Sequence, residues 1–573
     1  MLAQLVDLSL RQRLLVLLAA LGIAAWGFVS YRALPIDAFP DVAPTQVLVS
    51  MRAPGLPPEE LERRVTAPVE IAMRGIPNLV FMRSVTRFSV TLMTFEFAEG
   101  TDIFWARAQV NERLQQVMYD LPGGVSGGLA PIITPLAEML MFTLDGPNLN
   151  QTEARTLMDW VVRPALRTVP GVADVNTLGG YVRTYEVVPY PAAMAARGIT
   201  TRMLEEALEA NNRNDGAGRV RDGEEALLVR AEGRIQSLED VRAIVLASRD
   251  GRVVRIADVA DVRFGALARN GVVTRNGEGE AVWGIVLGLR GANARDVVEG
   301  ALSRIPEIER QLPEGVRLAV FYDRSDLIGK AVWTVQKVLL EAIVLVVILL
   351  LLFLGNLRAA LVVSCILPLA VLATFGIMRA YGLSANVMSL GGLAIAIGLL
   401  VDCAVVVVEN TAHHLNGAGR TTLRQRLQIT LESTREVTVP LVSGVIIIVT
   451  VFVPLLALQG LEGRLFAPVA LTIIFALLAA LLLSLTIVPA LCAYLLKAEP
   501  AHREPWLVRV LHRAYDPALA WSLGNPLKVG AGALGGMALA VVAFGQIGSI
   551  FMPVMDEGTP VISVRKFPTI SIE

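Results

Sequence analysis

Long stretches without a charged residue constrain this chain more than any other feature of its sequence. Each is longer than the 18 or so apolar residues that span a membrane as a helix. A soluble domain carries roughly 25% Asp, Glu, Lys and Arg, whereas this chain of 573 residues carries 18%. The sequence therefore predicts a polytopic membrane protein. They include residues 359–378, 437–461, 465–496 and 529–555.

The apolar pattern predicts about seven membrane helices and one large polar insert. Arg11 and Arg13 precede the first apolar stretch as in a signal peptide, but no small-residue cleavage site follows, so we expect a retained helix. The expected spans are 14–31, 338–355, 359–379, 386–410, 438–458, 465–496 and 528–550. The expected segments are a first membrane helix (1–33), two outer α+β subdomains (34–133 and 134–335), helices two to six (336–496), a cytoplasmic interfacial helix (497–527), a seventh helix (528–551) and the start of a second outer repeat (552–573).

Lys and Arg in the short loops predict the orientation of the chain, because cytoplasmic loops carry an excess of these residues. With a cytoplasmic N-terminus, twelve such cations lie on the cytoplasmic side, and two, Arg379 and Arg464, lie on the outer side. This distribution places the polar insert of about 300 residues outside.

Composition excludes several functional classes. The net charge of −1 does not suit a nucleic-acid-binding protein, which is usually strongly basic. All three cysteines lie in apolar runs, so the insert must be held by its own core rather than by disulfides. The sequence has neither a Walker motif nor HExxH zinc spacing. We therefore expect a transporter without a cofactor rather than an enzyme.

The insert alternates between strand and helix patterns in an order that recurs. Strand, helix, strand, strand and helix make up most of a split βαβ unit. The first set is 45–51, 57–76, 79–85, 89–97 and 101–118. The second set is 138–144, 152–168, 172–178, 181–188 and 201–211. The insert closes with a strand at 281–289, a helix at 293–312 and a strand at 316–322. The predicted fold is an all-α membrane bundle with an α+β insert of ferredoxin-like split βαβ modules.

Two segments near the C-terminus add further expectations. Residues 506–521 are amphipathic, and they fit either a helix lying in the cytoplasmic interface or a linker packed on the other helices. A shift of about 514 residues aligns Pro54 with Pro568 and Glu59 with Glu573, as in an internal repeat. We therefore expect that the chain stops as a second copy begins, as a truncated product or a fragment would.

The fourth expected span, 388–410, contains the most informative residue. Asp402 has no charged residue before it back to Arg379, so it lies well inside the hydrocarbon, at a cost of about 2.5–3.5 kcal/mol. Burial favours its neutral form, as a site that loads and releases a proton requires. Glu409, seven residues later, lies on the same helical face and is a weaker candidate for the relay. The alternatives are a structural ion pair for Asp402 and snorkelling to the interface for Glu409.

Other residues of the apolar runs and the insert have structural explanations that compete with functional ones. Gly391, Gly392 and Gly398 are expected to allow close helix packing. Cys403 and Cys492 are weak candidates for soft metal ligands, with core packing the alternative. Ten methionines of the insert suit Cu(I), but core filling explains each of them better. They are Met51, Met73, Met82, Met93, Met118, Met139, Met141, Met158, Met194 and Met203.

Several motifs resemble the heavy-metal efflux branch of the resistance–nodulation–division (RND) transporters. They are IDAFPDV (36–42), RSVTRF (83–88), GTDIFWARAQVNERL (100–114), YDRSDLIGKAV (322–332) and the VD-x-A-x-x-x-x-EN ending of the fourth span (401–410). The resemblance implies a proton-driven homotrimer of the bacterial inner membrane, with a periplasmic insert, that exports metal cations. It also implies a periplasmic adaptor and an outer-membrane channel as partners, and it covers the N-terminal half of such proteins.

The resemblance points to copper or silver as the leading expectation for the metal. Divalent-cation members place a second Asp at the position of Ala396, whereas copper and silver members do not. However, the membrane methionines of copper and silver members are replaced here by Leu400, Val407 and Cys492. The residues 398–402 also resemble the drug-exporting branch. A multidrug RND exporter and a non-transporting RND-like accessory subunit therefore remain as alternatives.

Overall fold

The structure is a computed structural model that describes residues 2–35, 37, 40–134, 136–249, 252–269, 271–418, 422–497, 506–548 and 558–565. The chain forms two compact units. The first contains residues 1–137, 288–298 and 323–560, and the second contains residues 138–287 and 299–322 with the described C-terminal residues 561–565.

Within the described residues, seven helices are long and apolar enough to cross a membrane. They are α2 (Arg13–Ala33), α12 (Arg324–Leu354), α13 (Leu357–Ala380), α14 (Val387–Gly417), α15 (Leu423–Leu456), α16 (Gly460–Leu495) and α18 (Pro526–Phe544). Two further helices of the first unit are α1 (Leu2–Arg11) and α17 (Trp506–Gly524). The helix α12 begins at Arg324, before the expected domain boundary at residue 335.

Side-chain caps explain where the long helices begin. Asp323 accepts hydrogen bonds from the backbone N–H groups of Ser325 and Asp326, and this cap starts α12 before its apolar part. Asn386 and Ser389 form a reciprocal capping box at the start of α14. Gly355, with φ of 62°, ends α12 in the left-handed conformation that glycine adopts without strain.

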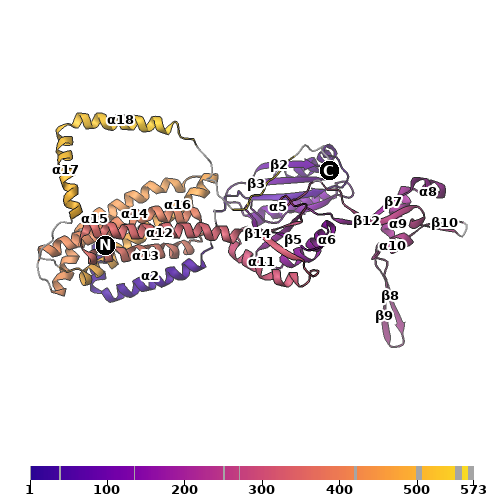
Figure 1. Ribbon diagram of the computed structural model, residues 1–573, viewed down its shortest axis with the longest axis horizontal. Coiled ribbons are helices and arrows are strands. Elements are labelled where there is room, and N and C mark those ends of the chain that lie inside the picture. Colours follow the sequence, from indigo (N-terminus) through magenta and orange to yellow (C-terminus); the bar gives the residue numbers. More distant parts are fainter. Residues whose placement is uncertain are drawn as a thin grey trace. The chain divides into compact units, whose positions relative to one another are not determined.

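The helices α2, α12, α13, α14, α15 and α16 pack side by side, with α14 and α16 in extensive contact (Figure 1). Small residues allow the closest approaches. A Cβ atom on Gly27 of α2 would collide with the backbone of Leu372 on α13, and one on Gly376 of α13 would collide with the ring of Trp26. These glycines therefore permit the α2–α13 crossing.

A four-stranded antiparallel sheet with strand order β2-β3-β1-β4 forms the first α+β module. Its strands are β1 (Gln46–Arg52), β2 (Leu79–Arg87), β3 (Val90–Phe97) and β4 (Ser126–Leu129). Its helical segments are α3 (Pro58–Leu61), η1 (Glu62–Thr66), α4 (Ala67–Met73) and α5 (Ile103–Met118). The core between sheet and helices contains Met51, Phe95, Leu61 and Val110, all fully buried. This element order agrees with the sequence prediction.

The second sheet has the order β14-β5-β13-β6, which repeats the topology of the first. Its strands are β5 (Glu138–Asp145), β6 (Val172–Leu178), β13 (Trp283–Gly288) and β14 (Arg317–Asp323), and its helices are α6 (Gln151–Leu157), η2 (Met158–Val162), α7 (Arg163–Leu166) and α11 (Ala294–Glu309). The expected use of 181–188 and 201–211 in this module was wrong. The elements after residue 280 complete it, because the segment 179–282 is inserted between β6 and β13.

A π-helical turn interrupts the first helix of both modules at equivalent places. The N–H of Ala67 bonds to the carbonyl of Glu62, and the N–H of Arg163 bonds to that of Met158. Pro68 and Pro164 each follow their π turn by two residues. Because proline lacks an N–H and its ring crowds the preceding turn, the wider turn accommodates it. This shared irregularity supports two related modules.

The inserted segment 179–282 forms a small domain of its own around a two-stranded ladder of β7 (Arg183–Pro189) and β12 (Ala260–Ala266). Leu204, Val241, Ile256 and Val262 belong to its core. The remaining elements are α8 (Pro191–Arg197), α9 (Thr201–Ala210), α10 (Leu238–Ala243), η3 (Ile256–Asp258), the hairpin β8 (Asp215–Asp222) with β9 (Glu225–Ala231), and the pair β10 (Val245–Arg249) with β11 (Arg252–Arg255).

The C-terminal segments bear on the packed-linker alternative for residues 506–521 and on the expected strand at 561–566. Nearly all described side chains of α17 are exposed, so it does not pack along its length on the other helices. The expected strand at 561–566 does not form over the described residues 561–565. The rest of the expected second repeat lies outside the described residues.

Candidate functional site

Asp402 lies at the midpoint of α14 and faces away from the helices that pack against it. Its side chain is exposed, as is that of Glu409 on the same face. Seven residues of α-helix separate the two carboxylates by about 10 Å along the axis. The expectation that they share a helical face therefore agrees with the structure.

The two carboxylates belong to a continuous exposed stripe along α14. Its members recur every three or four residues, which is the spacing of one helical face. They are Ile395, Gly398, Asp402, Val406, Glu409 and His413. The opposite faces of α14 pack on α12, α13, α15 and α16. The described part of the chain thus leaves the Asp402 face open for lipid or another polypeptide.

Asp402 lies on the surface of the described chain, so its predicted burial in the hydrocarbon stays a prediction. Within the described residues, its carboxylate forms neither an ion pair nor a hydrogen bond, so no fixed cationic partner comes from this part of the chain. Its neighbours Val401 and Cys403 are buried, because they face α16 and the other packed helices. The hydrophobic pattern could not predict this difference, since all sides of α14 are apolar around Asp402.

A polar cluster between α14 and α15 was missed by the sequence analysis. Asn410 donates to the carbonyl of Ser433 at 2.8 Å and to the carboxylate of Glu436 at 3.1 Å. His414 Nε2 lies 3.2 Å from the same carboxylate, and Thr411 and Ser433 share a hydrogen bond of 3.0 Å. His414 belongs to α14, which continues to Gly417. The sequence separation of more than 20 residues gave no signal for these contacts.

Cys403 and Cys492 are both buried in helix packing. Within the described residues, no three His, Cys, Asp or Glu side chains lie together as metal ligands would. Core packing therefore explains both thiols.

The three glycines of α14 do not share one role. A Cβ atom on Gly392 would lie 2.8 Å from the carbonyl oxygen of Val469 on α16, so this glycine permits close packing. A Cβ atom on Gly391 or Gly398 would meet no atom within 4 Å. Within the described chain, the predicted packing role thus has a contact to support it at Gly392, and it stays a prediction for Gly391 and Gly398.

The methionines of the insert lie in hydrophobic cores. Seven are buried, and the other three, Met82, Met118 and Met203, are partly buried. Met51, Met73 and Met93 belong to the core of the first module. This burial agrees with core filling rather than with an accessible soft-metal site.

A group of arginines holds the segment between α2 and the first module. Arg324 donates to the carbonyl of Leu136 at 2.5 Å and pairs with Asp37 at 3.2 Å. Arg290 pairs with Asp41 at 2.6 Å, and Arg464 of α16 lies 3.5 Å from Glu99 of the first module. Arg290 and Arg464 also both donate to the carbonyl of Ala43. These contacts couple the end of α16 to the first module within one unit.

Known proteins resemble this chain along nearly its whole length. The cation efflux system protein CzcA of Alcaligenes sp. is 41% identical over 586 residues, which cover 100% of this chain and 55% of that protein. The cation efflux system protein CusA of Escherichia coli is 35% identical over 575 residues, which cover 98% of this chain and 55% of that protein. The chain therefore spans about half the length of the curated relatives it matches.

A solved structure of a heavy metal efflux pump has the same fold. It superposes with a TM-score of 0.84 and 31% sequence identity, over 96% of this chain and 53% of that one. The family model described as the AcrB/AcrD/AcrF family matches residues 5–573. This match includes the long apolar helices, both α+β modules and the helix that carries Asp402. The chain is thus a membrane protein that belongs to the AcrB/AcrD/AcrF family of RND transporters.

Proposed function

We propose that this chain supplies the N-terminal half of a proton-driven exporter of heavy-metal cations. The observation that carries the proposal is the carboxylate of Asp402 at the midpoint of an apolar helix, on a face without a fixed cationic partner in the described chain. The names of the similar proteins, cation efflux system and heavy metal efflux pump, supply the substrate class.

In this proposal, Asp402 takes up and releases the protons that drive transport. An intramembrane carboxylate is costly, so its presence without a paired cation favours a functional role. Loss of the proton creates a charge whose hydration or pairing requires the neighbouring helices to move. A charge moving through the membrane potential provides about 2.3 kcal/mol per 100 mV. Glu409, about 10 Å further along the same face, is the next carboxylate on the path.

The metal belongs to one of two chemical classes. Similar proteins include a cobalt-zinc-cadmium resistance protein, CzcA of Cupriavidus metallidurans, at 41% identity over 586 residues, which favours divalent cations. Ala396, at the position where divalent-cation members of the branch carry a second Asp, favours copper or silver instead. It is fully buried on α14, where a second carboxylate would face the packed helices. Because overall similarity samples many residues and Ala396 is a single position, divalent cations are the stronger proposal.

The remaining features follow from the same resemblance. The exporter is proposed to be a homotrimer in the bacterial inner membrane, with the ferredoxin-like α+β modules in the periplasm. A periplasmic adaptor and an outer-membrane channel complete the complex. The chain orientation predicted from Lys and Arg supports this placement of the modules.

The test is rescue of a metal-sensitive bacterium by the gene in its full natural length. We expect growth in zinc, cobalt or cadmium, and loss of that growth with Asp402→Asn, which keeps the size of the side chain but cannot release a proton. Ile395→Val on the same exposed stripe is the matched control and should leave rescue unchanged. Western blotting of membranes must show equal amounts of each variant.

Three outcomes would contradict the proposal. Full rescue by Asp402→Asn would remove the proton role. Rescue from organic drugs but not from metals would favour a multidrug exporter. Absence of any rescue, with the protein correctly inserted, would favour an accessory subunit without transport. Rescue in copper or silver alone would leave metal export intact but reverse the choice of metal.

A further inference from the structure

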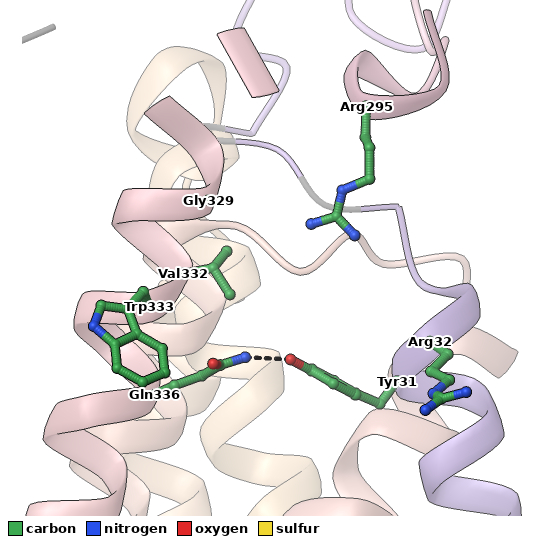
Figure 2. A pocket seen from close by; sticks show the side chains of 7 residues that line it. All are labelled: Tyr31, Arg32, Arg295, Gly329, Val332, Trp333 and Gln336. Atoms are coloured by element: carbon green, nitrogen blue, oxygen red, sulfur yellow. Dashed lines mark hydrogen bonds between the residues drawn. The ribbon is translucent and has the colours of Figure 1, made fainter. Parts of the chain in front are cut away.

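A cavity of about 290 Å³ lies between the end of α2 and the start of α12. We call it the α2–α12 cavity, and Figure 2 shows its lining side chains. They are Tyr31, Arg32, Arg295, Gly329, Val332, Trp333 and Gln336. All seven belong to the first compact unit. No described lining residue is acidic, so the chemistry of the cavity is set by hydrogen-bond donors and aromatic rings.

The position of the cavity along the helices places it at a membrane–water interface. Tyr31 and Arg32 lie in the last turn of α2, where this apolar helix ends. Trp333 precedes the apolar part of α12, which has no charged residue between Glu341 and Arg358. Trp and Tyr concentrate at the level of lipid headgroups because their rings are amphipathic. Trp333 is 66% exposed, as a side chain in contact with lipid headgroups would be.

The polar groups of the cavity point to an anion. The guanidinium of Arg295 extends from α11 into the cavity (Figure 2), and within the described residues it has neither an ion pair nor a hydrogen bond. Below it, the amide of Gln336 donates to the phenol oxygen of Tyr31. This bond leaves the phenol O–H and one amide N–H free to donate. Arg32 stacks on Phe28 at 4.7 Å, so Arg295 provides the cationic group inside.

Apolar surface beside the cavity distinguishes a lipid from a soluble anion. α2 and α12 each pack on α13, and their other faces expose large apolar side chains. Phe28 and Val29 are exposed on α2, and Leu340 and Val344 are exposed on α12. These residues continue from the polar cavity toward the middle of each span. An occupant with a phosphate at one end and acyl chains at the other therefore matches both parts of the surface.

We propose that the α2–α12 cavity binds the headgroup of an anionic phospholipid. The guanidinium of Arg295 binds the phosphate by charge-assisted hydrogen bonds, and Tyr31 and Gln336 donate to its remaining oxygens. Trp333 lies against the glycerol region, and the acyl chains follow the exposed apolar side chains of the two helices. The bound lipid would fill the gap between α2 and α12, which the Tyr31–Gln336 hydrogen bond spans.

Quenching of Trp333 fluorescence by brominated lipids tests this proposal on the purified full chain in phosphatidylcholine nanodiscs. The chain has seven tryptophans, so the signal of Trp333 is the difference between the parent and Trp333→Phe. The probes are phosphatidylglycerol and phosphatidylcholine with bromines near the headgroup. We expect brominated phosphatidylglycerol to reach half-maximal quenching at about a fivefold lower lipid fraction than brominated phosphatidylcholine. One Arg near a membrane surface contributes about 1 kcal/mol toward binding an anionic lipid.

Variants of Arg295 separate this site from general attraction of anionic lipids. Arg295→Ala should reduce the preference to less than twofold, and Arg295→Lys should retain most of it. Arg304→Ala removes one positive charge from the same helix outside the cavity, and the preference should remain about fivefold. Equal quenching by both lipids in the parent, or an unchanged preference in Arg295→Ala, would overturn the proposal. Displacement of phosphatidylglycerol by millimolar inorganic phosphate would assign the cavity to a soluble anion instead.

Discussion

Replacement of Gly392 by alanine should destabilise the packing of α14 on α16, whereas the same change at the adjacent Gly391 should not. An added Cβ at Gly392 would lie 2.8 Å from the carbonyl oxygen and 3.2 Å from the Cα of Val469. Ordinary contact begins at 3.4 Å, so the two helices would have to separate by about 0.6 Å at this point. At Gly391 no atom lies within 4 Å of the new methyl group.

The magnitude follows from two opposing effects. Alanine is more favourable than glycine in a helix by about 1 kcal/mol, and this gain applies at both positions. Overpacking of a close contact costs about 1–3 kcal/mol, and this cost applies at Gly392 alone. Gly391→Ala should therefore raise the free energy of unfolding by up to about 1 kcal/mol. The free energy of unfolding of Gly392→Ala should be about 1–3 kcal/mol lower than that of Gly391→Ala.

A thiol-reactive fluorogenic dye measures this difference in detergent. Cys403 and Cys492 are buried and become reactive on unfolding, whereas the exposed Cys365 is first replaced by serine to lower the background. Because membrane proteins often unfold irreversibly, all midpoints must be recorded at one heating rate. We expect Gly392→Ala to unfold several degrees below Gly391→Ala. Equal midpoints, or a higher midpoint for Gly392→Ala, would refute the assigned α14–α16 contact.

Three further predictions concern the soluble parts and their connection to the helices. Met51→Ala should lower the free energy of unfolding by about 2–5 kcal/mol because it creates a cavity, whereas Met51→Leu should lower it by less than about 1.5 kcal/mol. Chemical denaturation measures both values. A small effect of leucine, which cannot bind metal, indicates a core role for Met51. Arg324→Ala should cost about 1–3 kcal/mol because it removes the hydrogen bond to the carbonyl of Leu136 and the ion pair with Asp37, and limited proteolysis between α2 and the first module should speed up. The Arg269 guanidinium lowers the pKa of Glu280 by hydrogen bonding. The pair therefore stabilises the second unit fully at pH values above the ordinary Glu pKa of 4.5. This stabilisation is lost as the pH falls through the lowered pKa of Glu280. The unfolding temperature of Arg269→Ala should therefore fall less on acidification than that of the parent protein.

Local patterns predicted most elements of the fold. In the first module, three of the four strands and the helical segments were predicted within a few residues, because alternation and helical spacing are properties of neighbouring residues. The short, glycine-rich strand β4 (Ser126–Leu129) was missed. The expected spans likewise correspond to the seven long apolar helices of the described chain. The main errors at boundaries came from polar caps such as Asp323, which extends α12 beyond its apolar part.

The second module shows where local patterns fail. β6 was expected to be followed at once by its sheet neighbour, yet its neighbour β13 begins at Trp283. The strand β7 fits the pattern of a neighbour equally well, but it pairs with β12 in the inserted domain. As neighbours of β6, the strands β7 and β13 cannot be distinguished by their alternation of side chains. The choice between them depends on contacts between residues about 100 positions apart.

For the candidate site, hydropathy and charge were enough to single out Asp402 inside an apolar helix and to predict that Glu409 lies on the same face. They could not identify which sides of α14 are covered, because its residues are apolar all round. Packing against four helices leaves the Asp402 stripe open, places Gly392 rather than Gly391 against α16, and brings His414 to Glu436. Membrane insertion depends on summed side-chain hydropathy and is readable along the chain, whereas helix faces and strand partners depend on long-range contacts that arise when the chain folds.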